Sequence, residues 1–204
     1  GHTLQGIRGP VATLMRVPAE YEQAIQSALG TRLENIVTER WSDAEAAIAF
    51  LKERHSGWAT FLPLDTLRAR PPIKAARTPG VVGVASELIR FDADLQPVFD
   101  LLLGHVLVVD NLRVARRLLS ERSGASLLVT LEGDTAQPSG AVSGGARQVQ
   151  TRVLAQEREW RELPAQLHSA EEALSSASHS VATAQSEIDR LQRTLREQAS
   201  LLAS

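Results

Sequence analysis

Cysteine is absent from the 204 residues, and aromatic residues make up only 4% of them. Without cysteine the chain cannot form disulfides, thiolate metal sites or a cysteine nucleophile, a composition that fits a reducing cytoplasm. The scarcity of aromatic residues disfavours a stacking platform for single-stranded nucleic acid. The formal net charge is −2, so no overall basic field favours nucleic acid, and no apolar run approaches the length of a membrane span.

Signals for catalysis and metal binding are also weak. The five histidines are scattered and have no acidic partners at metal-ligand spacing. Ser139 and Ser143 lie far in the sequence from any His–Asp arrangement, and the glycine-rich stretch 131–146 lacks the Gly-Lys-Ser/Thr of a phosphate-binding loop. We therefore expect no catalytic residue, no metal site and no bound cofactor, which disfavours a small α/β enzyme.

An internal repeat occupies most of the chain. Residues 6–30 align with residues 80–104 without a gap, and most apolar positions stay apolar in both copies. The identical pairs are Gly6 and Gly80, Gly9 and Gly83, Leu14 and Leu88, Arg16 and Arg90, Ala19 and Ala93, Leu29 and Leu103, and Gly30 and Gly104. The repeat predicts two similar lobes related by a pseudo-twofold axis.

Each copy of the repeat continues with the same order of predicted elements: strand, helix, strand, helix, strand. The later helices are expected at 43–54 and 112–122, and the last strands at 58–62 and 126–131. Ser42-Asp43 is a plausible N-cap, and Gly30 and Gly104 suit left-handed helix ends. The prediction is a mixed α/β (α+β) fold with a separate core in each lobe.

The domain boundaries follow from the repeat and its linkers. Gly1-His2 is typical of a cleaved affinity tag. The predicted segments are a tag scar or arm remnant at 1–5, lobe 1 at 6–66, a linker at 67–79, lobe 2 at 80–146 and a helical arm at 147–204.

The arm carries a heptad pattern from Val153 to the end of the chain, with apolar positions stepping by three and four. Its predicted seam includes Leu167, Leu174, Val181, Ile188, Leu191, Leu195 and Leu202. About seven heptads in register favour one strand of a coiled coil. We expect a kink or break near Pro164 and a partner helix that enters just before Gly6.

Several short motifs follow one another in an order that points to one family. They are Gly6-Ile7-Arg8-Gly9, the run from Tyr21 to Gly30, Asn35-Ile36-Val37, Ala47 to Lys52, Ala59 to Leu64, Gly80 to Gly83, Leu102 to Gly104 with Val108 to Asp110, Val129 to Gly133, and Ser139-Gly140 with Ser143 to Gly145. The sequence resembles the hinge domain of the structural maintenance of chromosomes (SMC) family, of a bacterial or archaeal type.

This resemblance implies a function in chromosome condensation and segregation. It implies a homodimer in which each lobe pairs with the opposite lobe of its partner through sheet edges and glycine-rich turns. ATP and Mg would bind at ATPase heads outside this chain, and the protein would be cytoplasmic and nucleoid-associated. The implied interface glycines are Gly133, Gly140, Gly144 and Gly145, with Gly80 and Gly83 as weaker candidates.

DNA binding is the second expectation, and it is expected to be weak and independent of sequence. The candidate basic residues are Arg68, Arg70, Lys74, Arg77, Arg113, Arg116, Arg117, Arg147 and Arg152. The chain departs from the family in having Trp58 where a basic residue often precedes Ala-Thr-Phe-Leu-Pro, and it has no run of lysines after Gly145. The alternative function is a stand-alone α/β DNA-binding module without dimerisation, which would require a net basic face.

Overall fold

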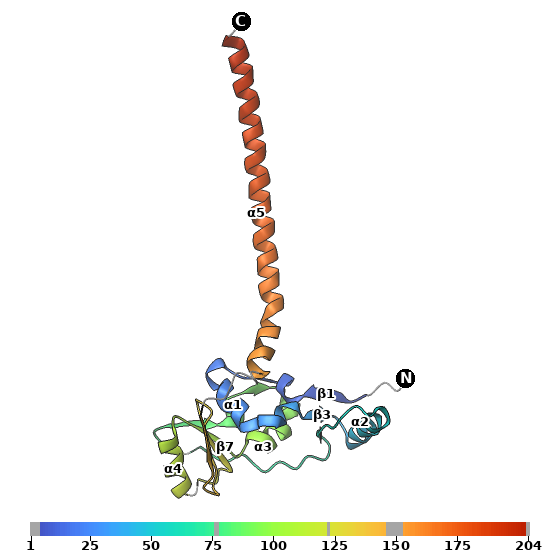
Figure 1. Ribbon diagram of the computed structural model, residues 1–204, viewed down its shortest axis with the longest axis vertical. Coiled ribbons are helices and arrows are strands. Elements are labelled where there is room, and N and C mark those ends of the chain that lie inside the picture. Colours follow the sequence, from blue (N-terminus) through green and yellow to red (C-terminus); the bar gives the residue numbers. More distant parts are fainter. Residues whose placement is uncertain (1–4, 76–77, 122, 146–152, 203–204) are drawn as a thin grey trace. The chain divides into compact units, whose positions relative to one another are not determined.

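The computed structural model describes residues 5–75, 78–121, 123–145 and 153–202, and it divides into two compact units, Gly1–Arg158 and Glu159–Ser204. The first unit holds every strand and most of the helices of the described residues (Figure 1). The second unit is the greater part of one long helix.

The first half of unit 1 alternates short strands with helices. Its elements are β1 (Ile7–Pro10), η1 (Val11–Thr13), β2 (Met15–Arg16), η2 (Ala19–Tyr21), α1 (Glu22–Leu29), η3 (Gly30–Glu34), β3 (Ile36–Thr38), α2 (Trp41–Arg54) and β4 (Phe61–Pro63). They form a three-stranded sheet of order β1-β3-β4, in which β1 is antiparallel and β4 parallel to β3.

The second half repeats this order and then adds a hairpin. Its elements are β5 (Val81–Val84), η4 (Ala85–Glu87), β6 (Arg90–Phe91), η5 (Ala93–Leu95), α3 (Gln96–Leu103), β7 (Val106–Val109), α4 (Leu112–Ser120), β8 (Leu127–Thr130), β9 (Thr135–Ala136) and β10 (Val142–Ser143). The sheet order is β10-β9-β8-β7-β5, again with an antiparallel β5–β7 pair and a parallel β7–β8 pair.

The predicted repeat is present in the structure. When Gly6 is aligned with Gly80, four elements of the first half have the same bounds as their counterparts in the second half. The pairs are β1 with β5, η1 with η4, η2 with η5, and α1 with α3. The first strand of each half also shifts register at an equivalent glycine, Gly9 or Gly83. This agreement confirms the mixed α/β class and the two lobes expected from the sequence.

A pair of two-residue strands joins the halves. β2 and β6 pair antiparallel, and Arg16 lies opposite Arg90, its own counterpart in the repeat. Equivalent residues lie opposite each other in an antiparallel pair when a twofold axis passes between them. The β2–β6 pair therefore marks the pseudo-twofold axis.

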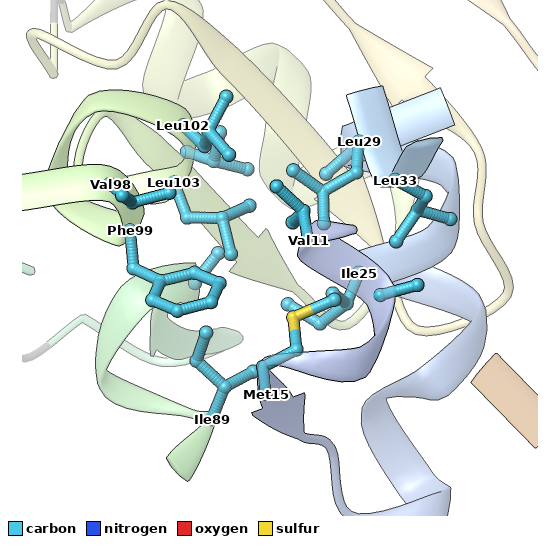
Figure 2. Packing of buried hydrophobic residues seen from close by; sticks show 14 of the residues in the cluster. Val11, Met15, Ile25, Leu29, Leu33, Ile89, Val98, Phe99, Leu102 and Leu103 are labelled. Carbon is cyan, nitrogen blue, oxygen red and sulfur yellow. The ribbon is translucent and has the colours of Figure 1, made fainter. Parts of the chain in front are cut away.

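One hydrophobic core spans both halves. Ile25 of α1 and Phe99 of α3 are fully buried in the same cluster, together with Val11 and Leu103. Figure 2 shows these side chains meeting from opposite sides, with Met15 and Ile89 near the β2–β6 junction. The Phe91 ring adds a tilted contact to Phe99, with ring centroids 4.4 Å apart. The expectation of a separate core for each half is therefore wrong.

A second, smaller cluster belongs to the second half alone. Leu118 of α4 packs there with Leu107, Leu128 and Ala136 from the five-stranded sheet. Among the described residues, neither cluster includes a residue of α2, the helix that corresponds to α4. The first half therefore has a thinner outer layer.

Two local expectations are corrected. Helix α2 begins at Trp41 rather than after Ser42, because the Asp43 carboxylate accepts the Arg40 N–H at 3.0 Å and Asp65 Oδ1 accepts the Trp41 N–H. Gly104 does not adopt a left-handed conformation: its φ is −63°, and its N–H continues the helix to the Asp100 carbonyl. Gly30 has a positive φ of 54°, but its ψ of −129° lies outside the left-handed helical region, so the expected left-handed end is not formed there either.

Helix α5 (Val153–Leu202) is the longest element, and it continues through Pro164 without a break. Proline leaves the carbonyl four residues earlier without its helical N–H donor, here the carbonyl of Trp160. The helical hydrogen bonds on either side of this position hold the helix together across the gap. No helix within the described residues is both long and apolar enough to cross a membrane.

We predict that Phe99→Ala destabilises both halves together by about 3–5 kcal/mol, because it removes a fully buried ring from the shared core. Leu101→Ala on the same helix is the matched control. Leu101 is 42% exposed, so its loss should change stability by about 0.5 kcal/mol or less. Urea unfolding followed by circular dichroism measures both variants. Two separate transitions in the Phe99 variant would contradict a single shared core.

Candidate interaction surfaces

The three-stranded sheet ends at β4, and no strand among the described residues pairs with its outer edge. The Ile36 N–H donates to the Thr60 carbonyl, and the Leu64 N–H donates to the Thr38 carbonyl. Positions 60, 62 and 64 therefore direct their backbone N–H and C=O groups towards β3. Phe61 and Pro63 consequently direct their backbone groups away from the sheet. Pro63 has no N–H, and its carbonyl accepts the N–H groups of Thr66 and Leu67. Phe61 is therefore the residue of β4 that offers both a donor and an acceptor.

The five-stranded sheet ends at β10, which offers a matching edge. Val142 lies opposite Ala136 of β9, and the neighbouring Ala141 carbonyl accepts the Gln137 N–H. In an antiparallel ladder these hydrogen bonds alternate, so the N–H and C=O of Val142 point away from β9. The Val142 side chain is 60% exposed. The strands β4 and β10 thus each offer one outward donor–acceptor pair at the edge of a sheet.

Two of the predicted interface glycines are required inside the subunit. Gly133 forms the turn between β8 and β9 with φ +87°, and a Cβ there would lie 2.6 Å from Ser27 Oγ. The adjoining Glu132 carbonyl accepts a hydrogen bond from Gln23 Nε2, so α1 of the first half supports this turn. A Cβ on Gly144 would collide with the Asp134 carboxylate. A side chain at Gly133 or Gly144 would disturb the fold before it reached a partner.

The other predicted interface glycines differ in their surroundings. Gly140 and Gly145 are exposed, and a Cβ on either would meet nothing within 4 Å. A Cβ on Gly80 would contact Val114 at 2.5 Å, and one on Gly83 would contact Leu88 at 3.3 Å. Gly140 and Gly145 are therefore the two whose open space could receive another chain.

The predicted basic residues form one local group on α4. Arg113 and Arg116 are exposed, and the helix contains no acidic residue. Arg117 is also exposed, but its Nη2 donates to the Pro79 carbonyl at 2.8 Å and so holds the linker. Lys74 is brought towards this helix because its neighbour Ile73 packs on the cluster that contains Leu118.

The remaining basic candidates are not joined to this group. Arg68 and Arg70 are exposed in the linker, where Arg68 donates to the Leu67 carbonyl. Arg77, Arg147 and Arg152 lie outside the described residues. The α4 group is therefore the part of the predicted basic surface that the structure brings together.

The predicted seam of the arm is exposed along the described part of α5. The exposed fractions of its apolar side chains range from 47% at Ile188 to 69% at Leu174 and Val181, and Leu167 and Leu191 fall between these values. Leu195 and Leu202 lie in the helix, but their side chains lie outside the described part. An apolar stripe of this length is left for a partner helix.

The base of α5 is fixed to unit 1 by contacts that the heptad pattern did not predict. Leu154 is 5% exposed and belongs to the shared core, and Val153 packs against the same cluster. Arg158 Nε donates to Glu22 Oε1 of α1 at 2.7 Å, and the Glu22 side chain is only 14% exposed. The first turns of the arm are therefore part of the core that joins the halves.

Leu154→Ala is predicted to destabilise unit 1 by about 2–5 kcal/mol, as for other buried leucines. Leu167→Ala, at a 60% exposed position of the same helix, should have an effect of about 0.5 kcal/mol or less. Amide hydrogen exchange in α1 and α3 reports the difference residue by residue. Equal protection in the two variants would mean that the arm is not anchored in the core.

Comparison with known proteins identifies the fold. The family model for the SMC proteins flexible hinge domain matches residues 4–119. The chromosome partition protein Smc of Lactiplantibacillus plantarum is 38% identical over 159 residues, which cover 76% of this chain and 13% of that protein. This chain thus spans about an eighth of the length of that relative.

Two solved structures share the fold. An asymmetric dimer of the Geobacillus stearothermophilus SMC hinge domain is 37% identical, with a TM-score of 0.75, and the match covers 91% of this chain and 76% of that one. The Pyrococcus furiosus Smc hinge domain with an extended coiled coil is 31% identical, with a TM-score of 0.60, covering 87% and 65%. The matched region is a hinge and not a catalytic domain. With the internal repeat, the two sheets and the long helix in agreement, the chain belongs to the SMC hinge domain family.

Proposed function

We propose that this chain is the homodimerisation hinge of an SMC protein that acts in chromosome condensation and segregation. The observation that carries the proposal is the pair of open sheet edges, each with one outward donor–acceptor pair, at Phe61 of β4 and Val142 of β10. The related hinge of Geobacillus stearothermophilus forms a dimer, which supports the same assembly here.

The two edges are complementary because the second half has an additional antiparallel strand, β9, at a position that is empty beside β4 in the described part of the first half. In the second half, β9 lies antiparallel beside β8, the strand that corresponds to β4. Within the described residues, no strand of the first half occupies that position beside β4. The edge strand β10 of a second copy would fill it, pairing antiparallel with β4. A twofold axis would then produce the same contact twice.

The remaining partners follow from the family. The exposed seam of α5 fits an N-terminal coiled-coil strand of the same protein, as the coiled-coil extension of the Pyrococcus furiosus hinge supports. ATPase heads that use ATP and Mg would lie beyond the arms, and the whole protein would act in the cytoplasm at the nucleoid. This hinge would join two such arms.

Val142→Pro is predicted to convert the dimer into a folded monomer. Proline removes the N–H that points away from β9, so the contact with the second copy is lost while the β9–β10 hydrogen bonds remain. We expect the molar mass from light scattering at micromolar concentration to fall by half, with little change in melting temperature.

Val142→Thr is the matched control, since threonine keeps the N–H and a β-branched shape. It should remain dimeric. If the proline variant stays dimeric, or if the unmodified chain is monomeric at the same concentration, the edge-to-edge proposal is wrong.

Weak DNA binding by α4 is a second candidate function. Arg113 and Arg116 are exposed on a helix without acidic residues, and Lys74 lies on the linker that packs beside it. Such a group can neutralise a few phosphates but does not recognise the DNA sequence. The affinity for DNA would therefore be weak and would fall with added salt, with a small slope of log K against log salt.

Replacing both Arg113 and Arg116 with glutamine should weaken duplex DNA binding equally for all sequences. It should also reduce the slope of log K against log salt by about 2, because each lost phosphate contact contributes about 0.9. Fluorescence anisotropy between low and moderate salt measures both effects. The control replaces Lys52 and Arg54 of α2 with glutamine, which removes the same charge from a helix that also carries acidic residues. Equal losses in the two variants would assign binding to net charge alone.

A further inference from the structure

Trp58 is the most exposed large hydrophobic residue among those described, with 95% of its surface open to solvent. It precedes the edge strand β4 by three residues and follows Gly57 in the loop after α2. Tryptophan is usually highly buried in folded proteins, and interfaces are enriched in it. Its place beside an open sheet edge suggests a contact with whatever occupies that edge.

The register of the proposed sheet junction identifies the contact. Antiparallel pairing that joins the outward groups of Phe61 and Val142 places residues before 61 opposite residues after 142. Thr60 then faces Ser143, and Trp58 faces Gly145, three positions from the centre on each strand. Directly opposed residues have Cβ positions about 4.5–5.5 Å apart, close enough for an aromatic ring to cover the facing position.

The facing position is suited to a large ring. Gly145 is exposed, and a Cβ there would meet nothing within 4 Å of its own chain. Its N–H donates to Asp134 Oδ1 at 3.2 Å, which holds the backbone in place. At Gly144, the Asp134 carboxylate of the same chain occupies the space that a side chain would take. The Gly145 backbone is therefore held by Asp134, and the space where its side chain would be is open.

We propose that Trp58 is the hydrophobic anchor of the dimer, packing its indole ring across Gly144-Gly145 of the second copy. This rests on the proposed dimerisation function and specifies which residue supplies much of its affinity. It also gives the glycine pair a role: Gly145 receives the ring, while Gly144 makes space for the Asp134 clamp. The contact occurs twice in the twofold dimer.

The first experiment measures affinity. Trp58→Ala should raise the dimer dissociation constant about 100-fold, because a buried interface tryptophan contributes about tenfold or more at each of two contacts. Trp41→Ala is the matched control, since Trp41 is 55% exposed on α2 and should leave the dissociation constant unchanged. Because both residues are exposed, neither change should alter the melting temperature of the monomer. Sedimentation velocity over a dilution series measures the constants.

The second experiment follows Trp58 directly. The chain has three tryptophans, so Trp41→Phe with Trp160→Phe leaves Trp58 as the single reporter. Its emission should move to longer wavelength on dilution, with the same midpoint as dimer dissociation. Emission typical of full exposure in the dimer, or a shift only on adding DNA, would overturn the proposal.

The third experiment tests the register and separates this inference from the proposed function. The chain has no cysteine, so Thr60→Cys with Ser143→Cys introduces the only thiols. Mild oxidation should give a covalent dimer, because opposed residues in a sheet lie within reach of a disulfide. A chain that dimerises without forming this link refutes the Trp58 contact but leaves dimerisation intact. A chain that stays monomeric at all accessible concentrations refutes both.

Discussion

The shared hydrophobic core is the constraint on which the rest of unit 1 depends. Ile25 and Phe99 come from equivalent turns of α1 and α3, yet they are buried in one cluster and not in two. The short β2–β6 pair fixes how these helices meet, because Arg16 lies opposite its own counterpart Arg90. Since neither half holds its main core alone, the two open edges of the chain are held in a fixed relation by apolar packing.

The halves have diverged around this common centre. The second half has α4 and β9 around a cluster of its own and β10 at the sheet edge, whereas α2 buries only the small side chains Ala44 and Ala47. The turn between β8 and β9 also rests on the first half through Gln23 and Ser27. Helix α1 therefore supports an edge that belongs to the other half of the sequence.

The repeat could be predicted from the sequence because it depends on local periodicity and on identities at glycine and leucine. The strand β7 (Val106–Val109) is an unbroken apolar run, as expected for a strand that is buried on both faces. The start of α2 could not be predicted, because Asp65, far away in sequence, accepts the Trp41 N–H. The capping preference of Ser42 was outweighed by this contact and by Asp43.

The roles of the glycines at the candidate site could not be predicted either, because they too depend on contacts with residues distant in sequence. A glycine-rich stretch indicates close approach of backbone, but not which backbone approaches. The structure assigns Gly133 and Gly144 to contacts within the chain, through Ser27 and Asp134, and leaves Gly145 open. Likewise, a heptad pattern records which side of α5 is apolar, while the burial of Leu154 in the shared core depends on residues distant in sequence.

The two sheet edges that we propose to pair between copies lie on one compact unit, which has a geometric consequence. Such a molecule is self-complementary, and self-complementary units either close into a ring or add end to end into an open polymer. Which of these occurs depends on the angle between the two edges, and that angle is set at the β2–β6 pair and the core around Phe99. Repacking a single buried side chain at this centre could change a closed pair into a filament without altering either edge.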